Sequence, residues 1–321
     1  MPEPQRKAAF VQPGGGAHLA WLGERLRYLV VGEQTAGRLT VSAAGIPPGG
    51  GTASHVRHRD HVGFYVFSGE PTFSVGNRTL AVPAGGFLAV PPGAACGFEN
   101  SGAEPAELLT FAAPAGFDEF QFRAGIPLPR ADAPVPPMTD EDRETLAALA
   151  SGYGVELDPS DAALRAEPNL RHVPPGEGES LAVVGDIYRF LAVSEDTEGK
   201  YALWHATVPP GGGPPWHSHS REDEAFYVLR GTVTFQADGA THRLGPGGFA
   251  HLPSGLKHRF GNETDEPSEM LVLVAPAGLE RMFATVGRPW HDASVPPGPP
   301  DNAEIERLIE EAPRYGIELY L

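Results

Sequence analysis

Short runs in which apolar and polar residues alternate recur along the chain, and most of them stop at a glycine- or proline-rich break. Alternation with a period of two is typical of a β-strand that turns one face to a core. The dipeptides Gly-Asn at 76–77 and Asp-Gly at 238–239 are typical of tight turns between hairpin strands. The predicted strands include residues 38–41, 72–75, 200–208, 233–236 and 270–274.

Helical patterns are few and short, and they occur at matching places in the two halves of the chain. Thr139 and Asp301 stand directly before the two longer patterns, where an oxygen-bearing side chain caps the first turn of a helix. Proline-rich linkers over 127–137 and 289–300 precede these caps. The predicted helices are 117–122, 140–150, 279–285 and 302–311.

The chain contains one repeat unit twice. It aligns with itself at a shift of 162 residues, without a gap from Gly37 to the end. Pro-Pro-Gly-Gly-Gly at 47–51 recurs at 209–213. Self-similarity over such a length predicts two domains of the same fold. We expect an N-terminal domain over 1–162 and a C-terminal domain over 163–321.

Composition and charge narrow the class of protein. The 40 glycines and 34 prolines among 321 residues favour a turn-rich β protein. A formal net charge of −17 repels phosphate backbones, so we do not expect nucleic acid as a partner. The single cysteine, Cys96, fits a reducing compartment, and neither a signal peptide nor a membrane-spanning run is visible. We therefore expect a cytoplasmic monomer or homodimer that does not bind a membrane.

Histidines and a glutamate gather in the second copy of the repeat. His217 and His219 are two residues apart, so on a strand both imidazoles point to one face. Glu224 follows five residues later, and His258 follows in a second glycine-rich stretch. Three imidazoles and one carboxylate make a nitrogen-and-oxygen site for a divalent first-row metal.

These two stretches resemble the signature motifs of the cupin superfamily, G-x5-H-x-H-x4-E-x6-G and G-x5-P-x-G-x2-H-x3-N, and both are matched in full. The resemblance implies an all-β fold of two tandem cupin barrels (double-stranded β-helix, or jelly roll) with short C-terminal helices in each repeat. It also implies that His217, His219, Glu224 and His258 ligate one divalent transition metal per chain. Iron, manganese, nickel and cobalt suit this set, and zinc would suit a non-oxidative reaction.

The first copy of the repeat has lost most of this ligand set. At the corresponding positions it has His55, Arg57, Val62 and Cys96. Valine offers no ligand atom, and arginine is a permanent cation that only donates hydrogen bonds. We infer that the N-terminal domain lacks the usual metal site, and we expect Cys96 to face the barrel interior as a small apolar group.

His58 and His61 leave a second interpretation of this domain open, because they follow His55 at intervals of three residues. Together with Cys96 these histidines could form an irregular site. In the alternative interpretation His58 and His61 are loop residues, because they align with positions of the second copy that are not ligands.

Several further residues are candidates for the surroundings of the metal. His205 and His251 occur only in the copy that keeps the ligand set, so either could contact the ligands or face the cavity. Trp216 alternates with the motif histidines and is expected to point away from the metal. Glu222 and Asp223 are expected to be solvated loop charges. The residues expected to form the apolar wall, from their strand parity, are Phe226, Val228 and Phe260.

Among two-barrel cupins the chain looks most like the quercetin 2,3-dioxygenase group. The likeness rests on Pro-Pro-Gly-Gly-Gly before the first motif, on E-D-E-A-F-Y-V-L-R-G within it, and on Pro-Ala-Gly after the second motif. It implies a metal-dependent ring-cleaving dioxygenase that acts on a flavonol or a similar polyphenol or enol. Dioxygen would be the co-substrate, and Glu224 would serve as ligand and base.

Two other functions remain open. A non-oxidative metal cupin enzyme (isomerase, cyclase or lyase) would use the ion as a Lewis acid on an enolisable small molecule. A small-molecule-binding cupin would keep the same cage without turnover. The motifs do not decide among these functions, since one fold hosts many chemistries.

Overall fold

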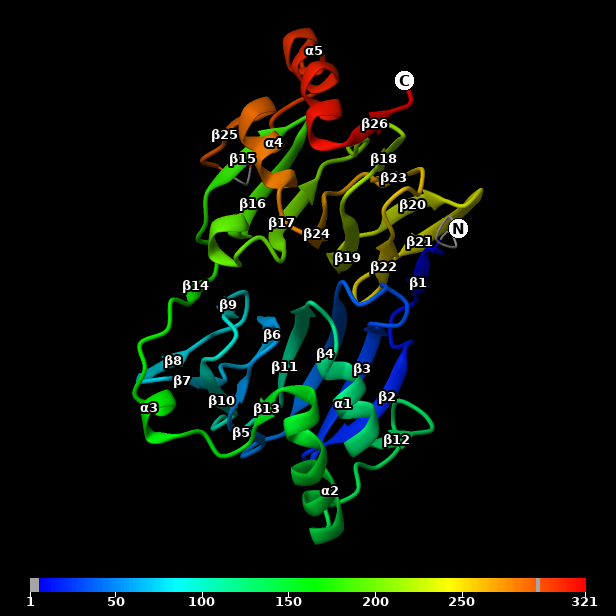
Figure 1. Ribbon diagram of the computed structural model, residues 1–321. Helices are drawn as coiled ribbons and strands as arrows, with labels where there is room; N and C mark the ends of the chain where they lie inside the picture. Colours follow the sequence, from blue (N-terminus) through cyan, green and yellow to red (C-terminus); the bar gives the residue numbers. More distant parts are fainter. Residues whose placement is uncertain (1–5, 293–294) are drawn as a thin grey trace, which may run out of the picture. The chain divides into compact units, whose positions relative to one another are not determined.

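The computed structural model of the chain describes residues 6–292 and 295–321, which form two compact units (Figure 1). One unit is Gly15–Gly176, called the first barrel below. The other combines Met1–Gly14 with Glu177–Leu321 and is called the second barrel. Each unit contains one eight-stranded and one five-stranded sheet, so the expected all-β fold of two barrels is confirmed.

The first barrel packs its two sheets around one apolar core. Phe64 and Phe73, one from each sheet, have ring centroids 5.0 Å apart. The sheet orders are β12-β2-β3-β4-β11-β6-β9-β14 and β13-β5-β10-β7-β8. The strands are β2 (Ala17–Trp21), β3 (Glu24–Val30), β4 (Thr40–Ile46), β5 (Gly51–Arg57), β6 (His61–Ser68), β7 (Thr72–Val75), β8 (Arg78–Ala81), β9 (Phe87–Val90), β10 (Ala95–Glu99), β11 (Ala106–Ala113), β12 (Ile126–Leu128), β13 (Val155–Glu156) and β14 (Arg171–Val173).

The second barrel has the same plan. Phe226 and Phe235, again one from each sheet, have ring centroids 5.2 Å apart in its core. The sheet orders are β1-β22-β19-β24-β17-β16-β15-β25 and β21-β20-β23-β18-β26. The strands are β1 (Ala9–Val11), β15 (Ser180–Val183), β16 (Asp186–Ala192), β17 (Ala202–Val208), β18 (His217–His219), β19 (Asp223–Arg230), β20 (Val233–Ala237), β21 (Ala240–Leu244), β22 (Phe249–Leu252), β23 (His258–Gly261), β24 (Ser268–Ala275), β25 (Arg288–Pro289) and β26 (Ile317–Leu319).

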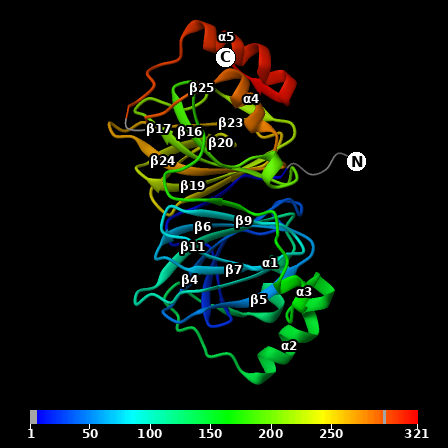
Figure 2. The same ribbon diagram turned by 90° about the vertical axis from the view of Figure 1, so that its left-hand side faces the viewer.

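The four predicted helices are present, with ends shifted by at most a few residues. Thr139 caps its helix as expected: its hydroxyl accepts the amide of Asp142 at 3.2 Å, and the Asp142 carboxylate accepts the Thr139 amide at 2.8 Å. Asp301 caps the last helix by accepting the amide of Glu304 at 2.8 Å. Figure 2 shows the last two helices side by side. The helices are α1 (Phe117–Ala124), α2 (Asp140–Ala150), α3 (Asp161–Leu164), α4 (Leu279–Val286) and α5 (Asn302–Glu311).

The division between the units differs from the boundary near residue 162 that the repeat predicted. β1 pairs with β22 of the second barrel, and β14 pairs with β9 of the first barrel. β1 begins at Ala9 and β14 begins at Arg171, which is a separation of 162 residues. Each repeat therefore gives its opening strand to the other unit. A self-alignment fixes the repeat length, whereas the pairing partner of a three-residue strand leaves no trace in the residue pattern.

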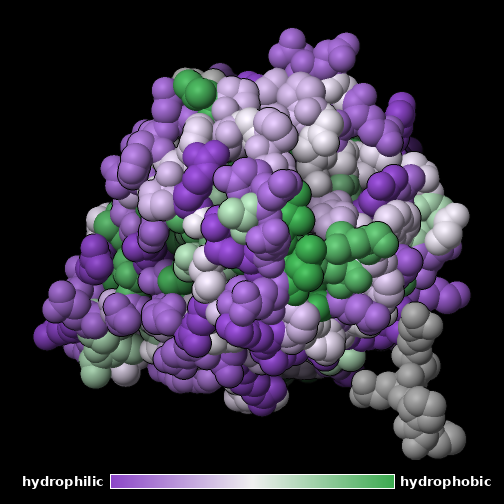
Figure 3. Space-filling model, turned by 90° about the horizontal axis from the view of Figure 1, so that it is seen from above, coloured by the Kyte–Doolittle hydropathy of each residue, from purple (hydrophilic) through white to green (hydrophobic). Residues whose placement is uncertain are grey.

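The surface adds two observations. In the described parts of the chain no helix has the length and apolar character required to cross a bilayer. Hydrophilic residues predominate on the face seen in Figure 3, where hydrophobic residues gather in separate patches.

The predicted linker over 289–300 includes residues 293–294, which lie outside the described residues.

We expect Phe10→Ala to destabilise the second barrel, because Phe10 of β1 stacks on His242 with ring centroids 3.7 Å apart and also lies against Phe235. Losing a packed aromatic side chain of this kind should cost ~1–3 kcal/mol of unfolding free energy. Amide hydrogen exchange in β22, the partner strand of β1, should become faster.

The matched control is Leu321→Ala, since Leu321 is 81% exposed and its loss should leave exchange in β22 unchanged. Unaltered protection of β22 in Phe10→Ala would show that β1 contributes little to this sheet.

Candidate metal centre

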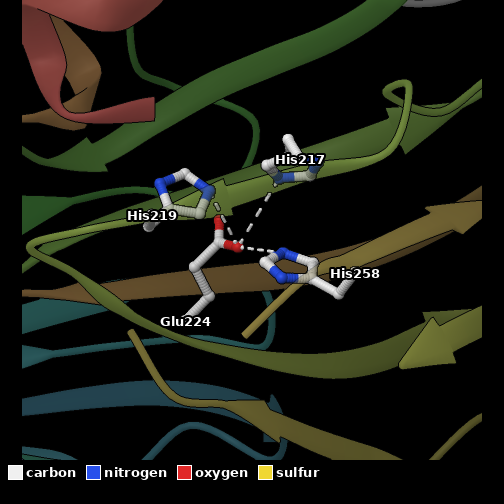
Figure 4. Close-up of side chains that lie close together, drawn as sticks. All are labelled: His217, His219, Glu224 and His258. Atoms are coloured by element: carbon white, nitrogen blue, oxygen red, sulfur yellow. Dashed lines mark hydrogen bonds and ion pairs between the residues drawn. The ribbon is translucent and has the colours of Figure 1, made fainter. Parts of the chain in front are cut away.

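Three strands of the second barrel bring four chemically active side chains together (Figure 4). β18 supplies His217 and His219, and β23 supplies His258 from the same sheet. His217 lies directly opposite His258 in the antiparallel register of these strands. Glu224 comes from β19 in the other sheet. The set therefore assembles only when the two sheets close on each other.

The four side chains converge on one buried point. Their nearest nitrogen and oxygen atoms all lie within 4.8 Å of one another, and each residue is at most 7% exposed. Glu224 Oε2 is 2.8 Å from His258 Nε2, 3.2 Å from His219 Nε2 and 4.0 Å from His217 Nε2. Among the described residues this is the one cluster of histidine, cysteine and acidic side chains with the geometry to hold a metal ion.

Backbone carbonyls fix the orientation of two of the rings. His217 Nδ1 donates to the carbonyl of Pro215 at 2.9 Å, and His258 Nδ1 donates to that of Leu256 at 2.9 Å. A ring that donates from Nδ1 carries its lone pair on Nε2, which in both residues is turned toward Glu224. A cation at this point would accept both lone pairs.

The hydrogen-bond inventory also fits a cation. His258 faces an oxygen at each ring nitrogen, the Leu256 carbonyl at Nδ1 and the Glu224 carboxylate at Nε2. His219 Nδ1 and Nε2 are buried, and neither makes a well-directed hydrogen bond within residues 6–292 and 295–321. A divalent ion at the Nε2 atoms would satisfy the rings and neutralise the buried Glu224 carboxylate. The donor set, three imidazoles and one carboxylate, is typical of first-row transition metals.

Burial and the charge of Glu224 both shift the pKa values of groups in this cluster. Burial opposes its charge, but contacts with His219 and His258 hold the pKa of Glu224 well below its usual range. Burial also opposes a charge on His219, yet the carboxylates of Glu224 and Glu222 raise the pKa of that ring to about 9. Burial and the neighbouring rings lower the pKa of His217 to about 3, so that ring is neutral and ready to coordinate.

The cluster borders a cavity of about 60 Å³ whose wall is mostly apolar. Phe260 lies in this wall, while Phe226 and Val228 are fully buried in the core behind it. Trp216 is directed away from the cavity, and its ring lies 5.3 Å from the Arg259 guanidinium. The lining comprises Val183, Val184, Asp186, Tyr188, Trp204, Pro214, Pro215, His217, His219, Glu224, Phe260, Val272, Leu279, Met282, Phe283, Leu308, Ile317 and Leu319.

His205 and His251 do not border this cavity. Trp204 faces inward on β17, so the next residue, His205, faces outward, where its Nε2 lies 3.3 Å from Glu269 Oε2. His251 is fully buried, and its Nε2 lies 3.1 Å from Asp223 Oδ2. Their presence only in this copy of the repeat is therefore unrelated to the cavity wall.

Glu222 and Asp223 are buried at 3% and 0% exposure, which corrects the expectation of solvated loop charges. Asp223 receives hydrogen bonds from Arg6 and from the amide of Ser254. Although burial opposes it, these bonds and that of His251 lower the pKa of Asp223 to about 2. Arg6 lies 217 residues away in the sequence, so no local pattern indicated this ion pair.

Three lining residues with polar side-chain atoms were not predicted from the sequence: Asp186, Tyr188 and Trp204. Asp186 is 1% exposed; its Oδ2 accepts the Tyr188 hydroxyl at 3.4 Å, and its Oδ1 has no hydrogen-bond partner in the described chain. Burial raises the pKa of Asp186 to about 8, so this side chain carries a proton near neutral pH. The sequence contains one indication that Asp186 matters, because the repeat aligns it with another acid, Glu24.

The first barrel has no comparable ligand set at these positions. Arg57 is ion-paired with Asp60, and Val62 is buried at 3% exposure. Cys96 is buried as expected, and burial raises the pKa of its thiol to about 12.

The two additional histidines of this barrel, His58 and His61, differ in their exposure to solvent. His58 is half-exposed, with Nε2 3.4 Å from a Glu156 oxygen. His61 is only 2% exposed and begins β6, which corrects its assignment to a loop. The matching residue Asp223 also begins a strand, so the repeat preserves the strand start and not the residue type.

Comparison with known proteins agrees with this architecture. Residues 44–112 and 204–274 both match the family model described as Cupin domain. The chain is 23% identical over 269 residues to quercetin 2,3-dioxygenase of Bacillus subtilis (strain 168), covering 80% of this chain and 78% of that protein. The chain is a bicupin of the cupin superfamily, with one cupin domain in each barrel.

Solved structures share the fold at low sequence identity. Protein Ylba from E. coli superposes with a TM-score of 0.57 at 14% identity, covering 84% of this chain and 91% of that one. Oxalate decarboxylase from Bacillus subtilis superposes with a TM-score of 0.55 at 17% identity, covering 86% and 79%. These likenesses concern the fold alone.

We expect one tightly bound divalent metal per chain, because only the second barrel has the ligand cluster. Elemental analysis after extensive dialysis measures this ratio. His217→Ala should abolish metal retention and leave a folded barrel, since the apolar core does not depend on that ring.

His55→Ala is the matched control at the corresponding position of the first barrel, and it should retain the parent metal content. Two equivalents per chain, or metal loss in His55→Ala alone, would show that the first barrel binds the ion.

Proposed function

We propose that this bicupin is a metal-dependent dioxygenase that cleaves a ring of a polyphenol or similar enol substrate at the cluster in the second barrel. The observation that carries the proposal is the buried group of three histidines and one glutamate at the end of an apolar cavity. The similarity of the chain to quercetin 2,3-dioxygenase, which extends over four-fifths of its length, supports the choice of reaction.

His217, His219, Glu224 and His258 would hold one ion of iron, manganese, nickel or cobalt. Such an ion supplies Lewis acidity and redox chemistry toward an enol and dioxygen. The apolar wall around Phe260 and Met282 would exclude water and would favour a flat, apolar body. These residues would orient the substrate with its enol oxygen toward the cluster.

Glu224 is the residue we assign as base. Contacts with His219 and His258 hold the pKa of its carboxyl below the usual range although burial opposes the charge, and the residue borders the cavity. An ionised carboxylate at this point accepts the proton of an acidic enol hydroxyl as the substrate enters. Asp186 and Tyr188, which form a polar pair in the same wall, would exchange hydrogen bonds with a second oxygen of the substrate.

A second candidate is non-oxidative chemistry on an enolisable small molecule, with zinc or nickel as the ion. Asp186 favours it, because the carboxyl group carries a proton near neutral pH in the same cavity as an ionised Glu224. An acid and a base in one cavity are what an isomerase, a cyclase or a lyase requires. A binding protein without turnover is the third candidate and would need neither group.

Oxygen consumption separates these functions. Protein purified without chelator, with its metal identified, is tested in an oxygen electrode against a panel of flavonols and other polyphenols. We expect dioxygen uptake that matches substrate loss and that disappears in His217→Ala. Substrate conversion without dioxygen uptake would establish the non-oxidative function, and binding without conversion would establish the third.

We expect Glu224→Gln to lower turnover on the order of 10²–10⁴-fold at saturating metal, the usual contribution of a positioned acid–base group. The amide oxygen can still coordinate an ion, but it accepts no proton in this pH range. Raising the pH should partly rescue the variant, because the substrate then arrives already ionised. The pH–rate profile of the metal-saturated variant is the measurement.

A profile that equals the parent in height and shape would leave Glu224 as a ligand only. Asp186→Asn would then be the next variant to test, because Asp186 is the other acid that borders the cavity.

A further inference from the structure

The first barrel keeps an internal cavity although it lacks the ligand set. The cavity measures about 70 Å³, close to the 60 Å³ of the second barrel, and it occupies the corresponding place around His55, Arg57, Val62 and Cys96. Protein interiors are close-packed, and an empty space forfeits contacts among the side chains that line it. A cavity that persists after its metal ligands are lost is therefore a candidate binding site.

Arg57 gives this cavity a fixed positive charge. It stands at the position of His219 in the other barrel, where a metal cation would be bound. One guanidinium nitrogen pairs with Asp60, and the guanidinium lies 3.8 Å from the centre of the Phe117 ring. Nε of Arg57 is buried and has no hydrogen-bond partner in the described chain. Because guanidinium has five N–H donors, the pair with Asp60 leaves Arg57 able to bind a further acceptor.

Val62 leaves room for such an acceptor beside Arg57. It occupies the position of Glu224, whose carboxylate in the second barrel lies between the rings of His219 and His258. In the first barrel no side chain supplies that carboxylate. A carboxylate brought by a ligand would take this place and accept the Arg57 Nε–H.

The other polar groups of the cavity are uncharged near neutral pH. Burial lowers the pKa of His55 to about 4 and raises that of Cys96 to about 12. Glu24 is 2% exposed, and burial raises its pKa to about 8, so its carboxyl carries a proton. Arg57 is therefore the one charged side chain that borders the cavity, and Asp60 pairs with it from outside the lining.

Aromatic rings form much of the remaining wall, which favours a flat ligand body. Glu24 adds a hydrogen-bonding group, since its Oε1 is buried without a partner in the described residues. A protonated carboxyl both donates and accepts, so it suits a hydroxyl substituent on such a ring. The aromatic lining residues are Trp21, Phe64, Phe98, Phe111 and Phe117.

We propose that the first barrel is a metal-independent binding site for a small aromatic carboxylate. The carboxylate would bind to Arg57 in the space beside Val62, and a hydroxyl on the ring would bind to Glu24. The proposal is independent of the reaction in the second barrel.

Calorimetric titration of the full chain with benzoate and 4-hydroxybenzoate tests the proposal. We expect one equivalent of benzoate per chain, tighter binding of 4-hydroxybenzoate, and binding of the neutral isostere benzamide weakened ~10-fold or more. Val62→Glu should weaken benzoate ~10-fold or more, because the new carboxylate takes the ligand's place while the pair between Arg57 and Asp60 stays intact. Val62→Ala is the matched control and should retain binding.

Two further variants locate the site. His217→Ala removes the metal site of the second barrel and should leave benzoate binding unchanged. Glu24→Leu, whose side chain neither donates nor accepts, should remove the advantage of 4-hydroxybenzoate over benzoate and leave benzoate itself unaffected. Absence of benzoate binding, equal binding of benzamide, full binding in Val62→Glu, or loss in His217→Ala would each overturn the proposal.

Discussion

The centre of this protein is one carboxylate that cannot be buried alone. Glu224 is 5% exposed and ionised, and such a charge in an apolar interior is stable only when it is closely paired. The three imidazoles of the five-stranded sheet provide that pairing across the space between the sheets. The register of β18 against β23, which sets His217 opposite His258, is what aims the rings at it. The most demanding electrostatic requirement of the fold is thus met at the point where a metal ion would bind.

The two barrels show how one scaffold supports opposite electrostatic solutions. In the second barrel a buried anion is surrounded by groups that can share a cation. In the first barrel Val62 removes the anion and Arg57 introduces a permanent cation, with Asp60 as its counter-ion. The position of Asp186 and Glu24 is acidic in both barrels, and burial raises both pKa values to about 8. The shared feature is therefore a protonated acid in the cavity wall, and the charge at the other positions distinguishes the barrels.

Much of the fold and of the candidate site could be predicted from the sequence. The features that could not be predicted share one physical cause. The repeat, the helix caps and the clustering of His217, His219 and Glu224 follow from spacing, because they depend on neighbours within a strand or a turn. The burial of Asp223 depends on Arg6, and the outward direction of His205 depends on the inward packing of Trp204. Contacts between residues far apart in the chain leave no local pattern. The self-alignment is the one sequence feature that relates distant residues, because it places Asp186 and Glu24 at corresponding positions of the two barrels.

The exchange of opening strands has a consequence for the independence of the halves. A chain divided at residue 162 would leave the C-terminal half without β1, so that β22 would present an unpaired sheet edge. The same half would carry β14 with its natural partner, β9, missing. Exposed edges of this kind recruit strands from other molecules. Two copies of a half-chain could close each other's edges by reciprocal exchange, as in domain-swapped dimers, and the tandem chain is the covalent equivalent of such a dimer.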